Sequence, residues 1–209
     1  MSTTRREKAL KPRNIPRQAR AQATNIVILE AAARVLIERG AHRFTTNHVA
    51  QCAGVSIGSL YQYYPNKAAL LLQLHVREAQ TTLQHLRHAV LDTGGTPRQR
   101  LRRGICVFFA TEAAEEPLRS ALARMDVLFA DTPEYQAIER NALELVQNFL
   151  ASAFKMTKRQ STTCAEIMVT LVASVAERVT SRTTDTNEVV RWANQVSDLL
   201  ETLLPNPAG

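Results

Sequence analysis

Long apolar stretches are missing from this 209-residue sequence, and no run approaches the roughly 20 residues that a transmembrane helix needs. Cysteine is scarce: Cys52, Cys106 and Cys164 each lie more than fifty residues from the next. Such an odd, scattered set argues against a disulfide framework and for reduced thiols. The basic N-terminus lacks the apolar segment and small-residue cleavage site of a secretory signal. We therefore expect a cytoplasmic protein that is not attached to a membrane.

Acidic residues are nearly absent from residues 1–20, where Glu7 stands against seven Lys and Arg side chains. Seven positive charges less one give +6, out of +7 for the whole chain, so the other 189 residues are close to neutral. Residues 1–16 are therefore predicted to form a flexible basic arm that follows a phosphate backbone in a salt-sensitive way. A disordered solubilising tail is the alternative interpretation.

Strand patterns are missing as well. Apolar residues recur at helical spacing, and Gly and Pro fall between the segments, which predicts an all-α protein. Gly40 is expected to end the first helix in a left-handed conformation, and Thr45 and Asn66 to cap the second and fourth helices. The helices are predicted at about 17–39, 45–53, 56–64, 66–93, 97–114, 117–130, 133–154, 162–181 and 187–204, followed by a frayed tail at 206–209.

The stretch "GVSIGSLYQYYPNK" (residues 54–67) combines small residues with a cluster of tyrosines. Read as a helix, one side carries Ile57, Leu60, Tyr61 and Tyr64, and the other carries Ser56, Gly58, Ser59, Gln62 and Tyr63. The second side is small and able to hydrogen-bond, which suits a helix whose N-terminal end enters a DNA major groove. With the preceding short helix and the turn at Gly54, this segment predicts a helix-turn-helix.

The segment "FTTNHVAQCAGVSIGSLYQYYPNKAALL" resembles the DNA-binding signature of the TetR (tetracycline repressor) family of bacterial transcription regulators. The resemblance covers residues 20–72 and implies an all-helical homodimer. It implies an N-terminal three-helix module (17–66) that binds a palindromic operator in double-stranded DNA. It also implies a C-terminal domain (67–205) for ligand binding and dimerisation, with 67–93 as the connecting helix.

The basic arm and the resemblance together predict the residues that contact DNA. These are Arg17, Arg20, Thr46, Asn47, Ser56, Ile57, Gly58, Ser59, Tyr61, Tyr63 and Lys67. For Ile57 two interpretations stay open, since helical geometry buries it whereas the resemblance places it near a thymine methyl group. Family members usually have Phe at position 64, so the hydroxyl of Tyr64 needs a partner or must lean to the surface.

Apolar side chains of the later helices predict two further surfaces. Those expected to line a ligand cavity are Phe108, Phe109, Met125, Phe129 and Phe149. The helix at 162–181 is apolar almost all round and needs cover on two sides, which predicts a four-helix dimer interface with the last helix. The residues expected there are Ile167, Leu171, Val175, Val179, Val189, Val196 and Leu200.

The resemblance implies a repressor that a small-molecule inducer releases from DNA, and we expect no cofactor and no bound metal. An activator or a metal- or redox-responsive regulator of the same fold is the alternative, since His85 and His88 have i, i+3 spacing and Cys106 offers a third ligand.

Residues Gly54–Gly58 also match the G-x-S-x-G motif of serine hydrolases. That motif needs a preceding strand and an acid followed by a histidine downstream; the only such order, Glu78 with His85 or His88, falls on one surface-patterned helix. We therefore expect no enzyme.

Overall fold

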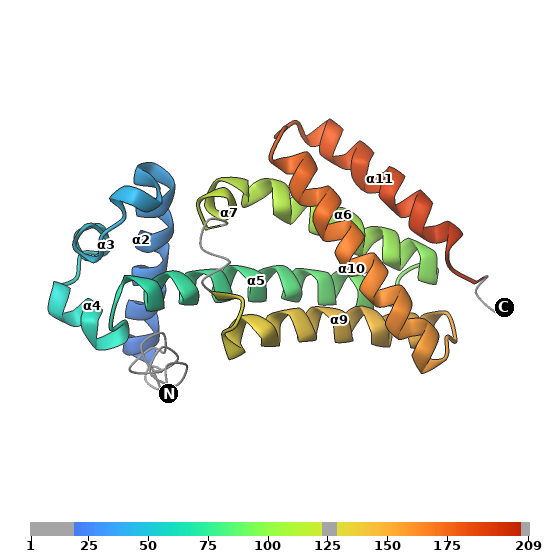
Figure 1. The fold of residues 1–209 in the computed structure, drawn as a ribbon, viewed down its shortest axis with the longest axis horizontal. Coiled ribbons are helices and arrows are strands. Elements are labelled where there is room, and N and C mark those ends of the chain that lie inside the picture. Colours follow the sequence, from blue (N-terminus) through green and yellow to red (C-terminus); the bar gives the residue numbers. More distant parts are fainter. Residues whose placement is uncertain (1–18, 123–128, 206–209) are drawn as a thin grey trace. The chain divides into compact units, whose positions relative to one another are not determined.

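The computed structural model describes residues 19–122 and 129–205, and all regular elements in these ranges are helices (Figure 1). The all-α prediction is thus confirmed. Contacts divide the chain into two compact units, of which the first contains the residues up to Glu78 and Pro117–Tyr135. The second contains Ala79–Glu116 and the residues from Gln136 onward. The helices are α2 (Ala19–Arg43), α3 (Thr46–Ala53), α4 (Ile57–Tyr63), α5 (Lys67–Leu91), α6 (Pro97–Ala114), α7 (Glu116–Leu122), α9 (Pro133–Ala153), α10 (Lys158–Thr180) and α11 (Thr186–Thr202).

Helix α2 changes direction at Gly40, where φ is 70° and ψ is 167°. The left-handed helix cap expected at this residue is therefore wrong: φ is positive, but the ψ value belongs to an extended conformation that is essentially restricted to glycine. The chain then makes one more helical turn to Arg43, so the element ends four residues later than the predicted Arg39. The predicted apolar stripe of α2 is buried: Ile28, Ala31, Ala32, Val35 and Leu36.

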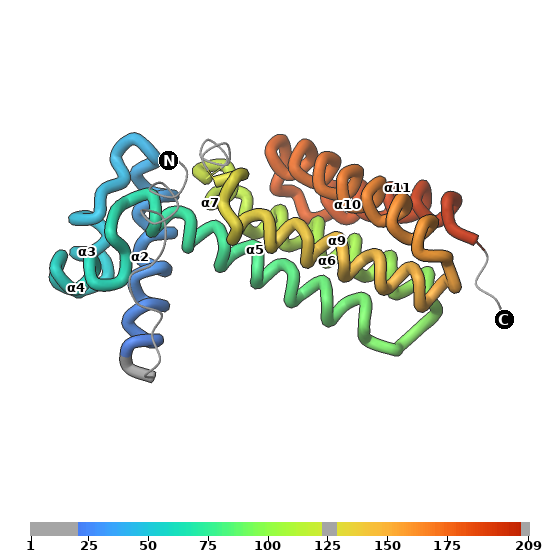
Figure 2. Tube along the Cα trace, turned by 60° about the horizontal axis from the view of Figure 1, so that its bottom comes forward, coloured from blue at the N-terminus to red at the C-terminus, as the bar shows by residue number. Residues whose placement is uncertain are grey.

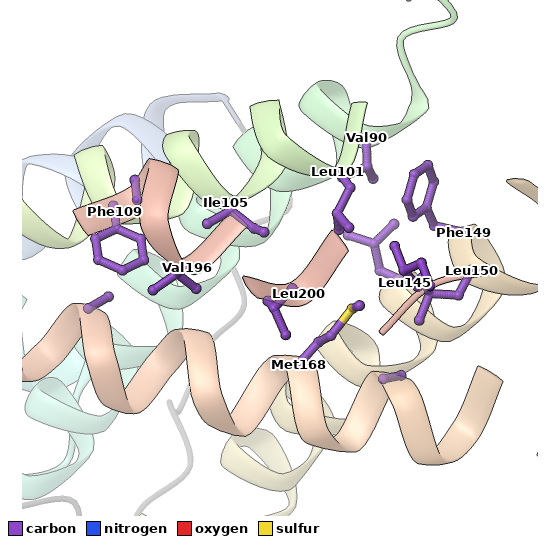
Figure 3. Close-up of a cluster of buried hydrophobic side chains, with 14 of the residues drawn as sticks. Val90, Leu101, Ile105, Phe109, Leu145, Phe149, Leu150, Met168, Val196 and Leu200 are labelled. Atoms are coloured by element: carbon purple, nitrogen blue, oxygen red, sulfur yellow. The ribbon is translucent and has the colours of Figure 1, made fainter. Parts of the chain in front are cut away.

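The second unit has a core to which α6, α9, α10 and α11 all contribute (Figure 3). Phe109 and Leu200 are fully buried in it, and Phe149 meets Phe154 edge to face at 6.1 Å between ring centroids. Helices α10 and α11 run side by side in Figures 1 and 2, and both pack on α6. Helix α10 begins at Lys158, earlier than the predicted residue 162, because Thr157 and Gln160 form a capping box in a polar stretch that was interpreted as a link.

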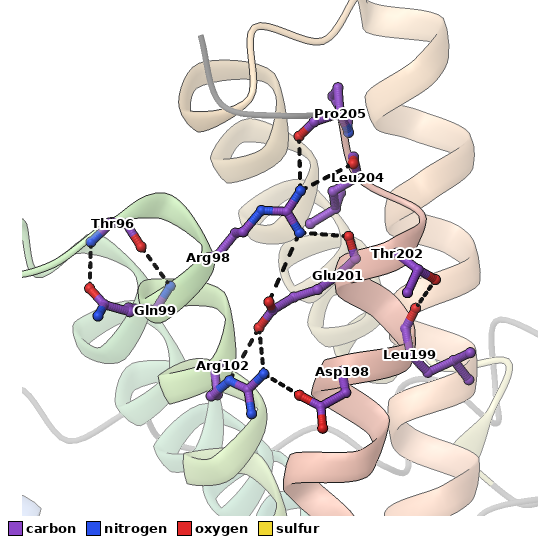
Figure 4. Close-up of polar contacts among 10 residues, drawn as sticks. All are labelled: Thr96, Arg98, Gln99, Arg102, Asp198, Leu199, Glu201, Thr202, Leu204 and Pro205. Atoms are coloured by element: carbon purple, nitrogen blue, oxygen red, sulfur yellow. Dashed lines mark hydrogen bonds and ion pairs between the residues drawn. The ribbon is translucent and has the colours of Figure 1, made fainter. Parts of the chain in front are cut away.

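Two arginines at the start of α6 hold the end of α11 (Figure 4). Arg98 donates to the backbone carbonyls of Glu201, Leu204 and Pro205, which satisfies groups that the end of α11 leaves without helical partners. Arg102 pairs with Glu201 at 2.8 Å and also with Asp198. Among the described residues, no helix is both long and apolar enough to cross a lipid bilayer.

Candidate nucleic-acid interface

Helices α3 and α4 are joined by a short turn whose geometry is set by Gly54. This residue has φ 66° and ψ 27°, a left-handed conformation, and its N–H donates to the carbonyl of Gln51 while Val55 N–H donates to Ala50. Such a conformation costs glycine little and other residues more. At the other end of α3, the Thr45 hydroxyl accepts from the N–H of His48 at 3.2 Å, as its capping role predicted. The structure therefore contains the helix–turn–helix that the sequence predicted.

Ser56 is the N-cap of α4 and lies just outside the helix. Its hydroxyl oxygen accepts from the backbone N–H of Ser59 at 3.0 Å and lies 2.8 Å from the Ser59 hydroxyl. A Cβ added to Gly58 would meet only the Ser56 hydroxyl, at 3.8 Å, so this end of α4 is open. A small, polar surface at a helix N-terminus allows close approach of a DNA backbone.

The side of α4 that was predicted to be apolar is only partly buried. Leu60 and Tyr64 are 0% and 1% exposed, whereas Ile57 and Tyr61 are 37% and 40% exposed. The geometric expectation that Ile57 is buried is therefore wrong. Helix α4 has only seven residues, and the rest of the unit covers it on the side of Leu60 and Tyr64 alone. The exposed Ile57 agrees with the alternative interpretation, a contact with DNA.

Tyr61 reaches from α4 to the start of α3, where its hydroxyl lies 3.1 Å from the Thr46 hydroxyl. Asn47 beside it is exposed, and Tyr63 on the other side of α4 is half-buried. This bond brings together two residues that were predicted to contact DNA. It also fixes the first turn of α3 against α4.

Lys67 begins α5 and points back to the turn before α3. Its ammonium donates to the carbonyl of Ala41 at 2.8 Å and lies 5.4 Å from the ring centroid of the buried Phe44. Partial burial lowers the pKa of Lys67. An ammonium has three donors, so the one bond to Ala41 leaves two for a phosphate.

Asn25 is a residue of this module that the sequence did not single out. Tyr64 is 1% exposed, and its hydroxyl donates to Oδ1 of Asn25 at 2.5 Å. Burial raises the pKa of Tyr64 well above its ordinary value, while the Asn25 bond opposes this rise. The partner that the hydroxyl required is thus on α2, thirty-nine residues away, and no local pattern marks it.

Two predicted DNA-contacting residues and one pocket residue cannot be placed. Arg17 and Met125 lie outside the described residues, as does the side chain of Arg20. Of the other predicted pocket residues, Phe109, Phe129 and Phe149 are at most 2% exposed and Phe108 is half-buried. Phe129 belongs to the first unit, and its ring lies 6.5 Å from that of His75.

The second unit has a groove of about 550 Å³ between the end of α5 and α9. Phe149, one of the residues expected to line a ligand cavity, lies in its wall beside Leu145, and the wall is both polar and apolar. The lining residues are Arg87, Leu91, Asn141, Glu144, Leu145, Asn148, Phe149 and Ser152. Phe108 and Phe109 do not line this groove.

The predicted interface residues divide into two groups. Val179, Val189, Val196 and Leu200 are at most 6% exposed and belong to the core of the second unit, so they are not available to a partner. Ile167 is 47% exposed, and Leu171 and Val175 are half-buried. Helical spacing located the apolar faces but did not distinguish cover by the same chain from cover by a second one. The large apolar residues exposed on α11 were missed: Val190, Trp192, Leu199 and Leu203.

The local structure bears on the hydrolase motif, on the histidine pair and on one of the three cysteines. The residues before Ser56 form α3, so the strand that a hydrolase motif requires is replaced by a helix. His85 and His88 are exposed on α5, and no group of three or more potential metal ligands occurs in residues 19–122 and 129–205. Burial raises the pKa of Cys106, which disfavours the reactive thiolate that a redox sensor needs.

Comparison with known proteins identifies this module. The profile of the family "Bacterial regulatory proteins, tetR family" matches residues 28–74. The chain is 35% identical over 82 residues to the HTH-type transcriptional activator FasR of Mycolicibacterium smegmatis, a match that covers 39% of this chain and 37% of FasR. The aligned segment thus spans little more than a third of that curated relative.

Solved structures resemble a much larger part of the chain. A TetR-like transcriptional regulator from Rhodococcus sp. RHA1 has a TM-score of 0.61 and 26% identity, over 88% of this chain and 96% of the other. The transcriptional regulator FadR of Bacillus subtilis, solved in complex with stearoyl-CoA, has a TM-score of 0.64 and 18% identity, over 84% and 96%. The family match over residues 28–74, together with the helix-turn-helix geometry, identifies this part of the chain as a TetR-family DNA-binding module, and the solved structures show that the fold of the chain is that of TetR-like regulators.

Proposed function

We propose that this chain binds a palindromic operator in double-stranded DNA as a dimer, and that a small molecule bound by the second unit releases it, so that the protein acts as a repressor. DNA binding is assigned to residues 17–66 and ligand binding and dimerisation to 67–205. The observation that carries the proposal is the open, uncharged start of α4 around Ser56, Gly58 and Ser59. Such a surface lets a helix end approach the floor of a major groove closely.

Exposed apolar side chains support the dimer. Trp192, Leu199 and Leu203 have i, i+7, i+11 spacing along α11 and are 38–54% exposed, and Ile167 on α10 is 47% exposed. Each of these two helices has one apolar face in the core and further apolar side chains that the chain leaves exposed. Such exposed faces are typical of a two-fold symmetric interface. A dimer presents two copies of α4, and operator half-sites then repeat at about one DNA turn, 34–36 Å, or a multiple of it.

The groove between α5 and α9 is the candidate ligand site in the described part of the second unit. Its volume of about 550 Å³ lies in the range of small-molecule sites. Helix α5 contributes Arg87 and Leu91 to this groove and begins at Lys67, directly after the helix-turn-helix. Suppose that α5 has one conformation that binds DNA and one that does not. A ligand that binds the second conformation more tightly lowers the affinity for DNA, by at most the difference between its affinities for the two conformations. FadR of Bacillus subtilis, which binds stearoyl-CoA, shows that a chain of this fold holds a small ligand.

Fluorescence anisotropy on the DNA flanking the protein's own gene tests the proposal. We expect sequence-selective binding that Ser59→Ala and Tyr63→Ala abolish, while weaker, non-selective binding remains. Equal affinity for this DNA and an unrelated duplex, or no binding at low salt, would overturn it.

A further inference from the structure

The helix-turn-helix of this chain has almost no charge of its own. From Phe44 to Asn66 the sequence contains no Lys, Arg, Asp or Glu, so α3 and α4 carry only polar and apolar side chains, with His48 as the one titratable base. Most of the affinity of a protein for duplex DNA comes from cations that neutralise phosphates. The charge that holds this module on DNA must therefore come from neighbouring elements.

Basic side chains gather at one corner of the first unit, where the end of α2 meets the start of α3. Arg39, His42 and Arg43 are all exposed there. Lys67 reaches the same turn from α5 through its bond to the carbonyl of Ala41. No acidic residue occurs between positions 39 and 77, and Glu38, directly before Arg39, is the one carboxylate next to this corner in the sequence.

His48 fixes this corner against α3. Its Nδ1 donates to the carbonyl of Arg43 at 3.3 Å, and its Nε2 accepts from the Arg39 guanidinium at 3.5 Å. The guanidinium is thereby held beside His48 in the first turn of α3. The Thr46–Tyr61 bond then joins this turn to α4, so the corner, the first turn of α3 and α4 are connected.

We propose that the α2–α3 corner, formed by Arg39, His42 and Arg43, binds the DNA backbone beside the major groove that α4 enters. This inference rests on the proposed function and adds to it the residues that neutralise phosphates. In this arrangement α4 selects the sequence, and the corner supplies sequence-independent affinity and positions α4 on the duplex.

The test compares Arg39→Gln and Arg43→Gln with Arg34→Gln in the full-length protein. Arg34 is exposed on the same helix and loses the same charge, but it lies five residues before Arg39 and therefore on a different side. Anisotropy titrations on the operator and on an unrelated duplex, repeated over a range of salt concentrations, give the slope of log K against log salt. We expect Arg39→Gln and Arg43→Gln each to make this slope about 1.8 less steep, about 0.9 for each of the two protomers of the bound dimer. They should weaken binding to both duplexes, and Arg34→Gln should leave the slope unchanged.

A basic residue in the last turn of a helix also offsets the helix dipole, which affects folding but not the salt slope. Melting curves of the three variants separate these effects. Unchanged slopes for Arg39→Gln and Arg43→Gln in a wild-type protein that binds its operator overturn this inference and leave the proposed function intact. Equal slope changes in all three variants overturn it too, because they indicate a general effect of net charge. If the wild-type protein does not bind DNA, the proposed function itself is overturned.

Discussion

The hydroxyl of Tyr64, at the C-terminal cap of α4, donates to Oδ1 of Asn25 on α2, and Tyr64 is 1% exposed. The resemblance to the family implied a Phe at this position, and a Phe side chain needs no partner. The bond therefore adds a polar link between α2 and the end of α4 without opening the core. Because the residue lies directly after α4, the link also limits how α4 can tilt.

We expect Tyr64→Phe to lower the free energy of unfolding by about 1 kcal/mol near pH 8, since it removes one buried hydrogen bond and the half-buried Asn25 can turn to water. Burial raises the pKa of Tyr64 in the folded state above the value of about 10 in the unfolded chain. The protonated Tyr64 side chain therefore makes its full contribution to the free energy of unfolding below pH 10. This contribution is lost as the pH rises above that value. Urea unfolding between pH 8 and 11 should show a steeper decline for the wild type than for Tyr64→Phe. Tyr63→Phe is the matched control, and identical declines in all three proteins would contradict the assignment.

Substitution by alanine should affect stability at Gly40 and operator binding at Gly58. Gly40 has the φ of 70° and ψ of 167° that only glycine tolerates, so Gly40→Ala should cost about 1–3 kcal/mol of stability. Gly58 lies within α4 with open space around it, so Gly58→Ala should leave stability within about 1 kcal/mol of the wild type. Its added methyl group should instead weaken operator binding about tenfold, roughly 1.4 kcal/mol. Thermal melts and anisotropy titrations of both variants check this, and a Gly58→Ala protein with wild-type operator affinity would remove α4 from the interface.

Gly104 and Val90 meet where α6 crosses the end of α5. A Cβ added to Gly104 would lie 2.7 Å from Cγ1 of Val90, which is too close for two carbon atoms. Gly104→Ala should therefore destabilise the second unit by about 1–3 kcal/mol, even though alanine is the better helix former. Val90→Ala in the same chain removes the clash, so the double variant should be more stable than the sum of the two single changes implies. Strict additivity in urea denaturation would show that the two side chains do not share this space.

Local signals predicted much of this fold from the sequence. Helix α6 has the predicted bounds of 97–114, and Thr45 and Asn66 cap α3 and α5 as expected, because a cap needs only residues within one turn. The turn at Gly54 has the same local origin. The resemblance to a known family identified the module for the same reason, since its motif is continuous in the chain.

Tertiary partners were not predictable in this way. Helical spacing placed Ile57 and Tyr61 on the apolar side of α4, yet nothing in the sequence says that only Leu60 and Tyr64 are covered. The bond from Lys67 to Ala41 joins residues twenty-six positions apart and likewise has no local signature. The early start of α10 was missed for a different reason: a capping box in an exposed polar stretch has the composition of a loop.

The exposed apolar stripe formed by Trp192, Leu199 and Leu203 predicts where the dimer interface lies. Leu199 is 54% exposed, so Leu199→Asp leaves the core unchanged but places a charge in the proposed interface. We expect this variant to be monomeric in analytical ultracentrifugation at concentrations where the wild type is a dimer, because an unpaired buried carboxylate is costly. Operator affinity should fall with it, since the two half-sites are then bound independently.

Val190→Asp is the matched control for Leu199→Asp. Val190 is on the same helix and is 48% exposed, but it lies nine residues earlier and is not part of the stripe formed by Trp192, Leu199 and Leu203. It should remain dimeric and bind the operator as the wild type does. Dissociation of both variants would mean that the interface extends round α11 beyond the stripe. A Leu199→Asp protein that stays dimeric would place the interface on another surface. Burying an unpaired carboxylate costs enough free energy to dissociate a dimer that has Leu199 in its interface.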